Sequence, residues 1–296
     1  MCRGFNTGAQ RAPWVHGYDG LAGNAGGLRR VGEGESFVKF ILGKTTIVAL
    51  KDGYVDMTTT RLRKPDGKPF GEDLPQSIPV VNGQFRLSVN AYLIVDGARH
   101  ILIDTGAADS CGPTMGRLLE SMREAGVDPS RVDTVAITHT HEDHVNGLVA
   151  ADGSSAFPNL KRLFVPSQAI PLFDNIDRLA RFRAMRVSIG DGFRIGRSVT
   201  AVSALGHELG HTAYELKGRD GTLLIWGDTV HVPAAQFDRP ELTWEFDADQ
   251  DKARESRLRL LQRCARRGCF IAGAHLDFPG VGYLTKPAAG YRFTAI

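Results

Sequence analysis

Short hydrophobic runs separated by turn residues fill most of the chain, and this pattern predicts many strands and few helices. The runs are rich in Val, Ile, Leu and Phe, and Gly or Asp-Gly pairs, which are typical of turns, stand between several of them. Asp52-Gly53 is one such expected turn. The expected strands are Phe37 to Leu42, Thr45 to Leu50, Ala91 to Val95, Ile101 to Ile103, Val132 to Ile137, Leu160 to Val165, Val199 to Ala204, Ala213 to Leu216, Leu223 to Trp226 and Phe270 to Ala274.

Two segments instead carry apolar residues at the spacing of one helix face. The first is expected to run from Pro113 to about Glu124, with Gly126 as its stop. The second is expected from about Asp249 to Arg267, with Leu258, Leu261 and Cys264 or Ala265 facing inward. Its arginines are expected on a solvated face: Arg254, Arg257, Arg259, Arg263, Arg266 and Arg267. Strands followed by interspersed helices indicate a layered α/β fold.

The first 34 residues lack any helix or strand period. Glycines recur every few positions there, so residues 1 to 34 are expected to form a loosely ordered arm before one domain at 35 to 296. Trp14, Val15 and Tyr18 could attach this arm to the domain or to a second subunit.

Composition excludes several classes of protein. With 42% hydrophobic and 23% charged residues, the chain resembles an ordinary globular protein. A net charge of +3 without a concentrated basic stripe indicates no nucleic-acid partner. The sequence has no long apolar run and no apolar leader. We therefore expect no membrane contact and a cytoplasmic location. The four cysteines form no C-x-x-C pair and are expected as reduced thiols: Cys2, Cys111, Cys264 and Cys269.

The strongest chemical feature follows the expected strand that ends at Ile137. Here His139, His141, Asp143 and His144 bring four metal-ligating side chains into six residues. Residues two apart in an extended chain point the same way, so His139 and His141 can reach one ion. Imidazole and carboxylate groups bind zinc and other borderline divalent metals. The alternative is a polar loop of hydrogen-bonded histidines, but so dense a cluster favours metal binding.

The H-x-H-x-D-H motif after a strand resembles the metallo-β-lactamase superfamily, over residues 35 to 296. The resemblance implies a four-layer αββα sandwich with two adjacent metals at one edge. It also implies three further ligands, which fit Gly210-His211, Gly227-Asp228 and Ala274-His275. The implied first metal site is His139, His141 and His211. The implied second site is Asp143, His144 and His275, and Asp228 is implied to bridge both.

Other residues are assigned supporting or catalytic roles. By the resemblance, Asp104 is a hydrogen-bond partner of the histidine loop, and His207 is structural or supports a ligand. His231, three residues after Asp228, either donates a proton to a leaving group or only lines the pocket. Asp143 and Asp228 are also expected to act in catalysis. Two metals can share a hydroxide that attacks a carbonyl or phosphoryl centre. Zinc is the default, while manganese, cobalt and iron suit the same ligands.

The C-terminal third is similar to the methyl parathion hydrolase-like and lactonase-like members of the superfamily. This closer resemblance is carried by Trp226-Gly227-Asp228, Ala234-Ala235-Gln236-Phe237, Ala274-His275-Leu276, Phe278-Pro279-Gly280 and Gly290-Tyr291-Arg292-Phe293. It implies a homodimer acting on small esters or lactones, with organophosphate triesters as side substrates. Cys111 stands where an organophosphatase has an aromatic pocket residue, which counts against a dedicated enzyme of that kind.

Residues 157 to 205 also depart from that group. Their phenylalanines and arginines form either a lid over the metals or a packed helix, and packing is favoured. The main alternative function is a phosphodiesterase or nuclease of the same superfamily, motivated by the arginines of residues 178 to 186 and of the last helix. An iron redox protein and a metal-binding module without catalysis are two further alternatives.

Overall fold

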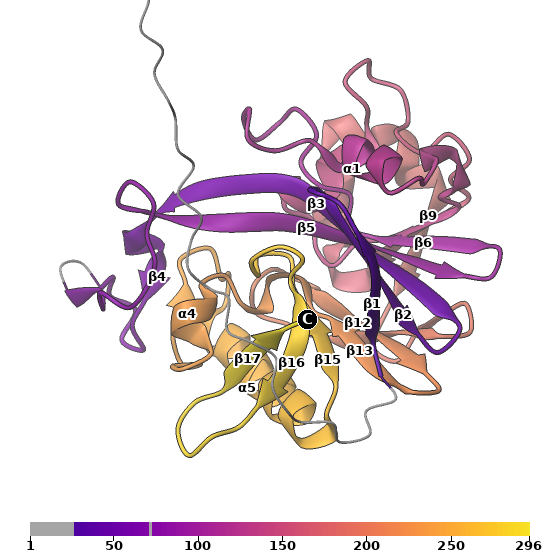
Figure 1. Cartoon of the computed structure of the whole chain (residues 1–296). Helices are drawn as coiled ribbons and strands as arrows, with labels where there is room; N and C mark the ends of the chain where they lie inside the picture. The colour runs from indigo at the N-terminus through magenta and orange to yellow at the C-terminus, as the bar shows by residue number, and fades with distance from the viewer. Residues whose placement is uncertain (1–26, 71–72) are drawn as a thin grey trace, which may run out of the picture.

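Two β-sheets lie face to face in the computed structural model, which describes residues 27–70 and 73–296 (Figure 1). The first sheet contains, in spatial order, β1 (Arg29–Glu33), β2 (Phe37–Leu42), β3 (Thr45–Thr58), β5 (Gln84–Asp96), β6 (Arg99–Ile103), β7 (Thr134–Ala136), β8 (Arg162–Pro166) and β9 (Arg186–Ile189). The second contains β10 (Arg194–Ile195), β11 (Val199–Ser203), β12 (Thr212–Gly218), β13 (Gly221–Ile225), β15 (Phe270–Ala272), β16 (Val281–Thr285) and β17 (Arg292–Ala295). A separate pair joins β4 (Leu62–Arg63) to β14 (Thr243–Trp244).

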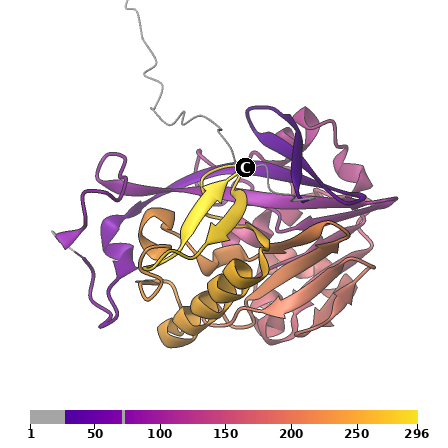
Figure 2. The same ribbon diagram turned by 60° about the horizontal axis from the view of Figure 1, so that its bottom comes forward.

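The helices are α1 (Leu118–Glu124), α2 (Glu142–Val145), α3 (Ile170–Asp174), α4 (Pro233–Gln236) and α5 (Gln250–Arg267). Helices α1 and α3 cover the outer face of the first sheet, and α5 covers that of the second (Figures 1 and 2). The 3₁₀ turns are η1 (Thr59–Arg61), η3 (Pro129–Arg131), η4 (Asn146–Leu148), η5 (Ser167–Ala169), η6 (Asp177–Met185) and η7 (Gly227–Thr229). The four-layer αββα arrangement is therefore confirmed.

Three hydrophobic clusters hold the layers together. One fills the space between the sheets, where Ile94 belongs to the same cluster as Tyr214 and Ile225. A second lies under α1 and α3, and a third joins α5 to the second sheet through Leu260 and Leu261. Burial of these apolar side chains is the main force that stabilises the layers.

The strand predictions hold with altered ends, since every expected run overlaps a strand. The expected turn at Asp52-Gly53 is wrong, because β3 continues through a bulge there. The buried Asp52 carboxylate accepts hydrogen bonds from the backbone N–H groups of Ala107, Gly116 and Leu118. These bonds place the bulge against the loop that follows β6.

Both helix predictions need corrections. The first helix begins at Leu118 rather than Pro113, because Gly116 adopts a positive φ of 86°. The second helix has its expected bounds, since it runs from Gln250 to Arg267 with Asp249 as its N-cap. On α5, Leu258 is 39% exposed whereas Arg257 is only 1% exposed, so the expected orientation is wrong for these two residues.

Residues 29–33, which the sequence placed in a loosely ordered arm, instead form β1 and pair with β2. Trp14, Val15 and Tyr18 lie outside the described residues. The homodimer stays a prediction. Among the described residues, no helix is both long and apolar enough to cross a membrane.

Residues 157–205 are part of the packed layers: they form β8 and β9 of the first sheet, β10 and β11 of the second, and the segment between β8 and β9 that packs on the first sheet. Phe173, Leu179 and Phe182 are buried in its outer core cluster. Arg178 donates to Asp109, and Arg186 pairs with Asp174. The favoured prediction of packing is thus confirmed, although Phe193 stays 37% exposed.

Candidate metal centre

The histidine loop leaves the first sheet at the end of β7 and is held by a buried carboxylate. Asp104, which follows β6, accepts hydrogen bonds from Thr138 N at 2.7 Å and Thr138 Oγ1 at 2.8 Å. Its Oδ2 also lies 2.9 Å from His144 Nδ1. This bond directs His144 Nε2 the other way, toward Asp228. The expected support of the loop by Asp104 is confirmed.

The second sheet brings the remaining side chains to the same edge. Asp228 lies in η7 directly after β13, and His275 follows β15. His275 Nδ1 donates to Ser88 O at 2.8 Å, which turns Nε2 toward Asp228. Gly227 has a positive φ of 54°, and a Cβ there would lie 2.7 Å from His211 Nε2. A side chain at this position would therefore displace the loop that carries Asp228.

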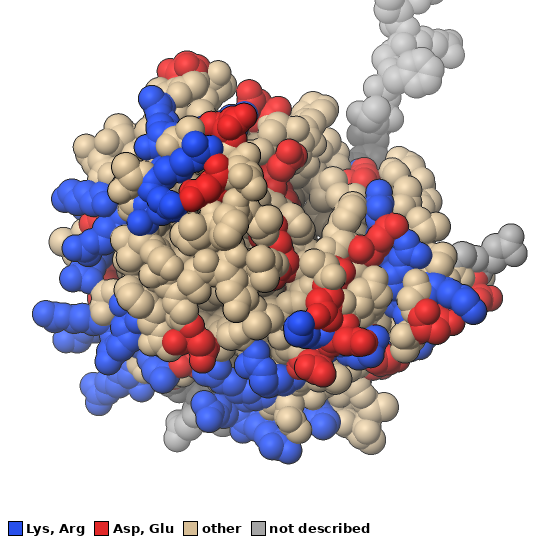
Figure 3. Space-filling model, turned by 180° about the vertical axis from the view of Figure 1, so that it is seen from behind, with Lys and Arg blue, Asp and Glu red and all other residues tan. Residues whose placement is uncertain are grey.

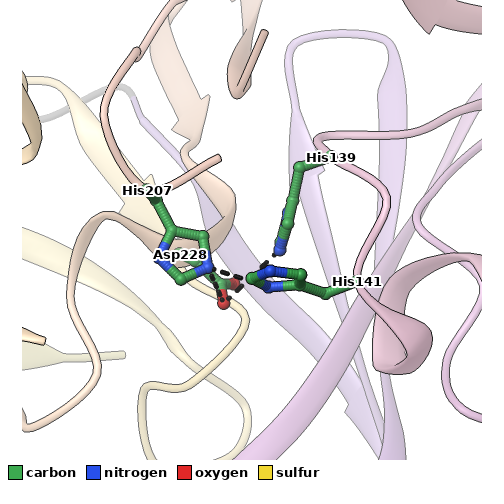
Figure 4. Close-up of side chains that lie close together, drawn as sticks. All are labelled: His139, His141, His207 and Asp228. Atoms are coloured by element: carbon green, nitrogen blue, oxygen red, sulfur yellow. Dashed lines mark hydrogen bonds and ion pairs between the residues drawn. The ribbon is translucent and has the colours of Figure 1, made fainter. Parts of the chain in front are cut away.

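The first group of converging side chains is His139, His141, His207 and Asp228 (Figure 4). The ligand atoms of these residues all lie within 4.8 Å of one another. His207 Nε2 lies 3.2 Å from Asp228 Oδ2 and 3.1 Å from His141 Nδ1. His139 Nε2 lies 3.7 Å from the same Asp228 oxygen. All four atoms therefore face one small volume.

The second group is Asp143, His144 and His275. Asp143 Oδ2 lies 3.5 Å from His144 Nε2 and 3.6 Å from His275 Nε2. Asp228 reaches this group as well, with Oδ1 3.1 Å from His144 Nε2 and Oδ2 3.0 Å from His275 Nε2. The Asp228 carboxylate thus stands between the two groups, as a bridging ligand would.

His211, which the sequence assigned as a ligand, is not brought into either group. Its Nδ1 donates to Ala204 O at 2.8 Å, and its Nε2 accepts from Asp228 N at 3.2 Å. Both ring nitrogens are therefore used by the backbone, and burial lowers the pKa of His211 to about 3. His207 takes the expected place of His211. Because both histidines follow a glycine, the local motif could not separate them, but only His211 directly precedes a strand.

The donor set fits two adjacent divalent cations. His139 Nε2, His144 Nε2 and Asp228 Oδ1 are buried and have no hydrogen-bond partner. Unpaired buried polar atoms are costly, and two adjacent cations, one beside His139 and one beside His144, would satisfy these atoms. Burial, with the neighbouring His144, holds the pKa of His139 well below 6.5, so its lone pair is free. Burial raises the pKa of Asp228, but His275 and His144 outweigh it and keep that carboxylate ionised.

A cavity of about 450 Å³ opens beside the two groups. Its wall is largely apolar and, among the described residues, contains neither Lys nor Arg: Val55, Met57, Leu87, Cys111, Met115, His141, Glu142, Asp143, His207, Asp228, His231, Trp244, Phe246 and His275. Cys111 thus lies in the cavity wall. Cys111 has a small side chain at the position where the resemblance implies an aromatic residue in organophosphatases.

His231 lies over the Asp228 carboxylate. Its ring stacks on Trp244, with ring centroids 4.9 Å apart, and on His275 at 5.1 Å. Its Nε2 is 3.2 Å from Asp228 Oδ2, while its buried Nδ1 has no partner. Burial lowers the pKa of His231 to about 4. A neutral ring that lines the cavity can donate one hydrogen bond to a bound substrate or leaving group.

Sequence reasoning missed two carboxylates that hold the ligands. Glu208 accepts from Thr140 N at 2.6 Å and lies 3.6 Å from His141 Nε2. Asp247 Oδ1 lies 2.9 Å from His207 Nδ1. Glu208 adjoins His207 in the sequence, which was a usable signal. Asp247 is a single acidic residue 40 positions away from its partner, and no pattern marks it.

Comparison with known proteins identifies the class. Residues 85–265 match the family model of the metallo-β-lactamase superfamily, and the chain belongs to this superfamily. It is 27% identical over 159 residues to a hydroxyacylglutathione hydrolase of Photobacterium profundum, covering 52% of this chain and 50% of that protein. It is 26% identical over 157 residues to a β-lactamase-like protein 2 homologue of Caenorhabditis elegans, covering 50% and 46%. The chain spans about half the length of these curated relatives.

Solved structures extend the likeness over most of the chain. The hydrolase AbOPH of the β-lactamase superfamily superposes with a TM-score of 0.80 at 28% identity, covering 90% of this chain and 99% of that one. AidC, a dizinc quorum-quenching lactonase solved with N-hexanoyl-L-homoserine, gives a TM-score of 0.75 at 20% identity, covering 88% and 97%. The second likeness is one of fold.

Proposed function

We propose that this protein is a dinuclear metal-dependent hydrolase of small neutral esters or lactones. The observation that carries the proposal is the position of Asp228. Its buried carboxylate contacts both groups of candidate ligands and borders an apolar cavity. The neighbouring folds named as a hydrolase and as a dizinc lactonase support the same class of chemistry.

We assign one ion to His139, His141, His207 and Asp228, and the other to Asp143, His144, His275 and Asp228. Two such cations would polarise a carbonyl or phosphoryl oxygen and lower the pKa of a water molecule toward neutrality. Zinc suits this set of imidazole and carboxylate ligands, and remains our choice. His231 is proposed to donate a hydrogen bond to the leaving group from above Asp228, because its neutral ring has no spare proton to transfer.

The cavity wall argues for a neutral substrate with an apolar part. Trp244, Phe246 and Met57 offer apolar contact area, and no described lining residue is a Lys or Arg that could pair with a carboxylate or phosphate of the substrate. Carboxylesters, lactones and, as a side activity, organophosphate triesters meet this description. The thiol of Cys111 offers no aromatic face for a nitrophenyl group.

The positive charge of the molecule lies elsewhere. On the face shown in Figure 3, Lys and Arg gather along one edge and the bottom rather than in the middle. Arg178, Arg181 and Arg186 are engaged with Asp109, Gly153 O and Asp174. None of the arginines that motivated a nuclease lines the cavity, which disfavours a phosphodiesterase.

The test is turnover on a matched set of substrates. Metal-loaded protein is given an aryl carboxylester, an acyl-homoserine lactone, a dialkyl aryl phosphotriester and a phosphodiester, and kcat/KM is compared. Asp228→Asn, which keeps the side-chain volume, serves as the catalytic control. The expected result is that ester or lactone turnover leads and that the variant loses it while remaining folded. Preferred cleavage of the phosphodiester, or undiminished turnover in the variant, contradicts the proposal.

A further inference from the structure

One arginine of α5 is buried beneath the metal centre. Arg257 is 1% exposed, although the rest of its helix carries arginines on the surface. Its Nε donates to Thr229 O at 2.7 Å, and Nη1 donates to Pro240 O at 3.2 Å and to Leu242 O. Its guanidinium thus joins the residue next to Asp228 to the segment that leads into the cavity wall.

The same guanidinium faces the carboxylate that holds His207. Arg257 Nη2 lies 3.6 Å from Asp247 Oδ2. That oxygen also accepts from Trp244 N at 2.9 Å, and the other oxygen, Oδ1, lies 2.9 Å from His207 Nδ1. A buried chain therefore runs from α5 through Asp247 to His207, with a branch to Trp244.

The backbone repeats this connection. Ala248 N donates to His207 O, and Asp249 N donates to Gly206 O, each at 2.9 Å. Gly206 has a φ of 123°, and a Cβ there would lie 2.0 Å from Ala253 N in the first turns of α5. The loop that carries His207 is thus pressed directly onto the start of the helix.

We propose that Asp247 and Arg257 are positioning residues that orient His207 as a metal ligand and hold Trp244 in the cavity wall. This inference rests on the proposed role of His207 in binding a metal. Asp247 fixes the ring so that Nδ1–H donates to it and the Nε2 lone pair faces Asp228 and His141. Partners of this kind commonly alter metal affinity about 10- to 100-fold.

The geometry calls for an arginine at position 257. Its planar fork donates to three carbonyl oxygens and leaves one edge toward Asp247. A lysine ammonium is a compact charge without this fork, so it cannot reach all of these acceptors at once. Arg257 thus acts on His207 through Asp247.

The experiment measures metal affinity rather than turnover. Zn²⁺ is titrated into metal-free protein in competition with a chromophoric chelator, for the wild type, Asp247→Asn, Arg257→Met, Arg257→Lys and the double variant Asp247→Asn/Arg257→Met. Arg266→Met is the matched control, because Arg266 is exposed on the same helix. Circular dichroism verifies folding.

We expect Asp247→Asn and Arg257→Met each to lower the affinity for one of the two Zn²⁺ ions by about 10- to 100-fold and to leave the affinity for the other unchanged. The affinity of the double variant should fall no further than that of the more strongly affected single variant, because Arg257 acts through Asp247. Arg266→Met should bind both ions as the wild type does. Wild-type affinities in Asp247→Asn, or fully additive losses, overturn the proposal. If Arg257→Met does not fold, the near-isosteric Asp247→Asn and the charge-retaining Arg257→Lys decide it.

His207→Ala separates this inference from the proposed function. If that variant keeps both ions at wild-type affinity, His207 is not a ligand and the proposed ligand set fails. If it loses one ion while Asp247→Asn binds both normally, the ligand set stands and only the positioning role is wrong.

Discussion

At the scale of single residues, the site depends on which ring nitrogens are left free by the backbone. His211 uses both nitrogens, one on Ala204 O and one on Asp228 N, whereas His207 keeps Nε2 directed at Asp228. A histidine whose lone pair is taken by a backbone N–H cannot ligate a metal without breaking that bond. This distinction separates a ligand from a structural residue only four positions away.

We therefore expect opposite results for two substitutions. His207→Ala should lose one metal ion and nearly all turnover. His211→Asn should retain both ions, and its free energy of unfolding should fall by about 1–3 kcal/mol, because a buried hydrogen bond is lost or distorted. Metal analysis after gel filtration and urea titration measure both effects. Loss of metal from His211→Asn with full retention in His207→Ala would restore the assignment made from the sequence.

Metal binding should depend on pH through the same residue. Burial lowers the pKa of His207, but Asp228 and Asp247 outweigh it and raise that pKa to about 9 in the metal-free protein. The ring is then protonated at neutral pH, and a metal must displace the proton. Affinity should thus rise as pH increases toward 9, with proton release on binding. Calorimetry in buffers of different ionisation enthalpy measures the released protons, and binding without release contradicts this expectation.

The candidate residues were largely predictable because their spacing is local or follows a family motif. His139, His141, Asp143 and His144 need only one loop, and Asp228 and His275 each lie shortly after the end of a strand. The supports of the site were not predictable in the same way. Asp247 and Arg257 reach it only through the packing of α5, and the sequence pattern placed Arg257 on a solvated face.

At the scale of elements, the bulge in β3 allows the strand to continue into the wall of the cavity. An Asp-Gly pair is typical of a turn that ends a strand, but here Gly53 adopts a φ of 152° and the strand continues to Thr58. Val55 and Met57, which line the cavity, lie in this continuation. The bulge is stabilised by backbone N–H groups that donate to the Asp52 carboxylate from a loop distant in sequence. No local sequence pattern could therefore predict it.

Gly53→Ala should destabilise the protein strongly, because a Cβ there would lie 2.0 Å from Thr114 O. We expect the free energy of unfolding to fall by roughly 2–4 kcal/mol. Gly97→Ala is the matched control, since Gly97 has a φ of 62° and a Cβ added there would meet no atom within 4 Å. It should cost about 1–2 kcal/mol from backbone strain alone. Equal losses in urea titrations would show that close contact at the bulge is unimportant.

At the scale of the whole molecule, the metal centre lies where the two sheets meet. The loop after β7 in the first sheet supplies His139, His141, Asp143 and His144. The second sheet supplies His207 before β12, Asp228 after β13 and His275 after β15. The layered fold was predictable from the family motif, but the pairing of loops across the sheets required the packed structure.

Metal removal should therefore weaken the whole fold and not only the catalytic loop. Ions that bind only the folded chain stabilise it by about 4 kcal/mol when their concentration is 1,000 times the dissociation constant. Chelation should lower the Tm, and added Zn²⁺ should restore it. Asp228→Asn removes the carboxylate oxygen shared by both groups, so its Tm should respond less to Zn²⁺. Because the ligands come from both sheets, hydrogen exchange in metal-free protein should accelerate on both sides of the site. Faster exchange confined to residues 138–145 would mean that the ions order one loop and do not join the sheets.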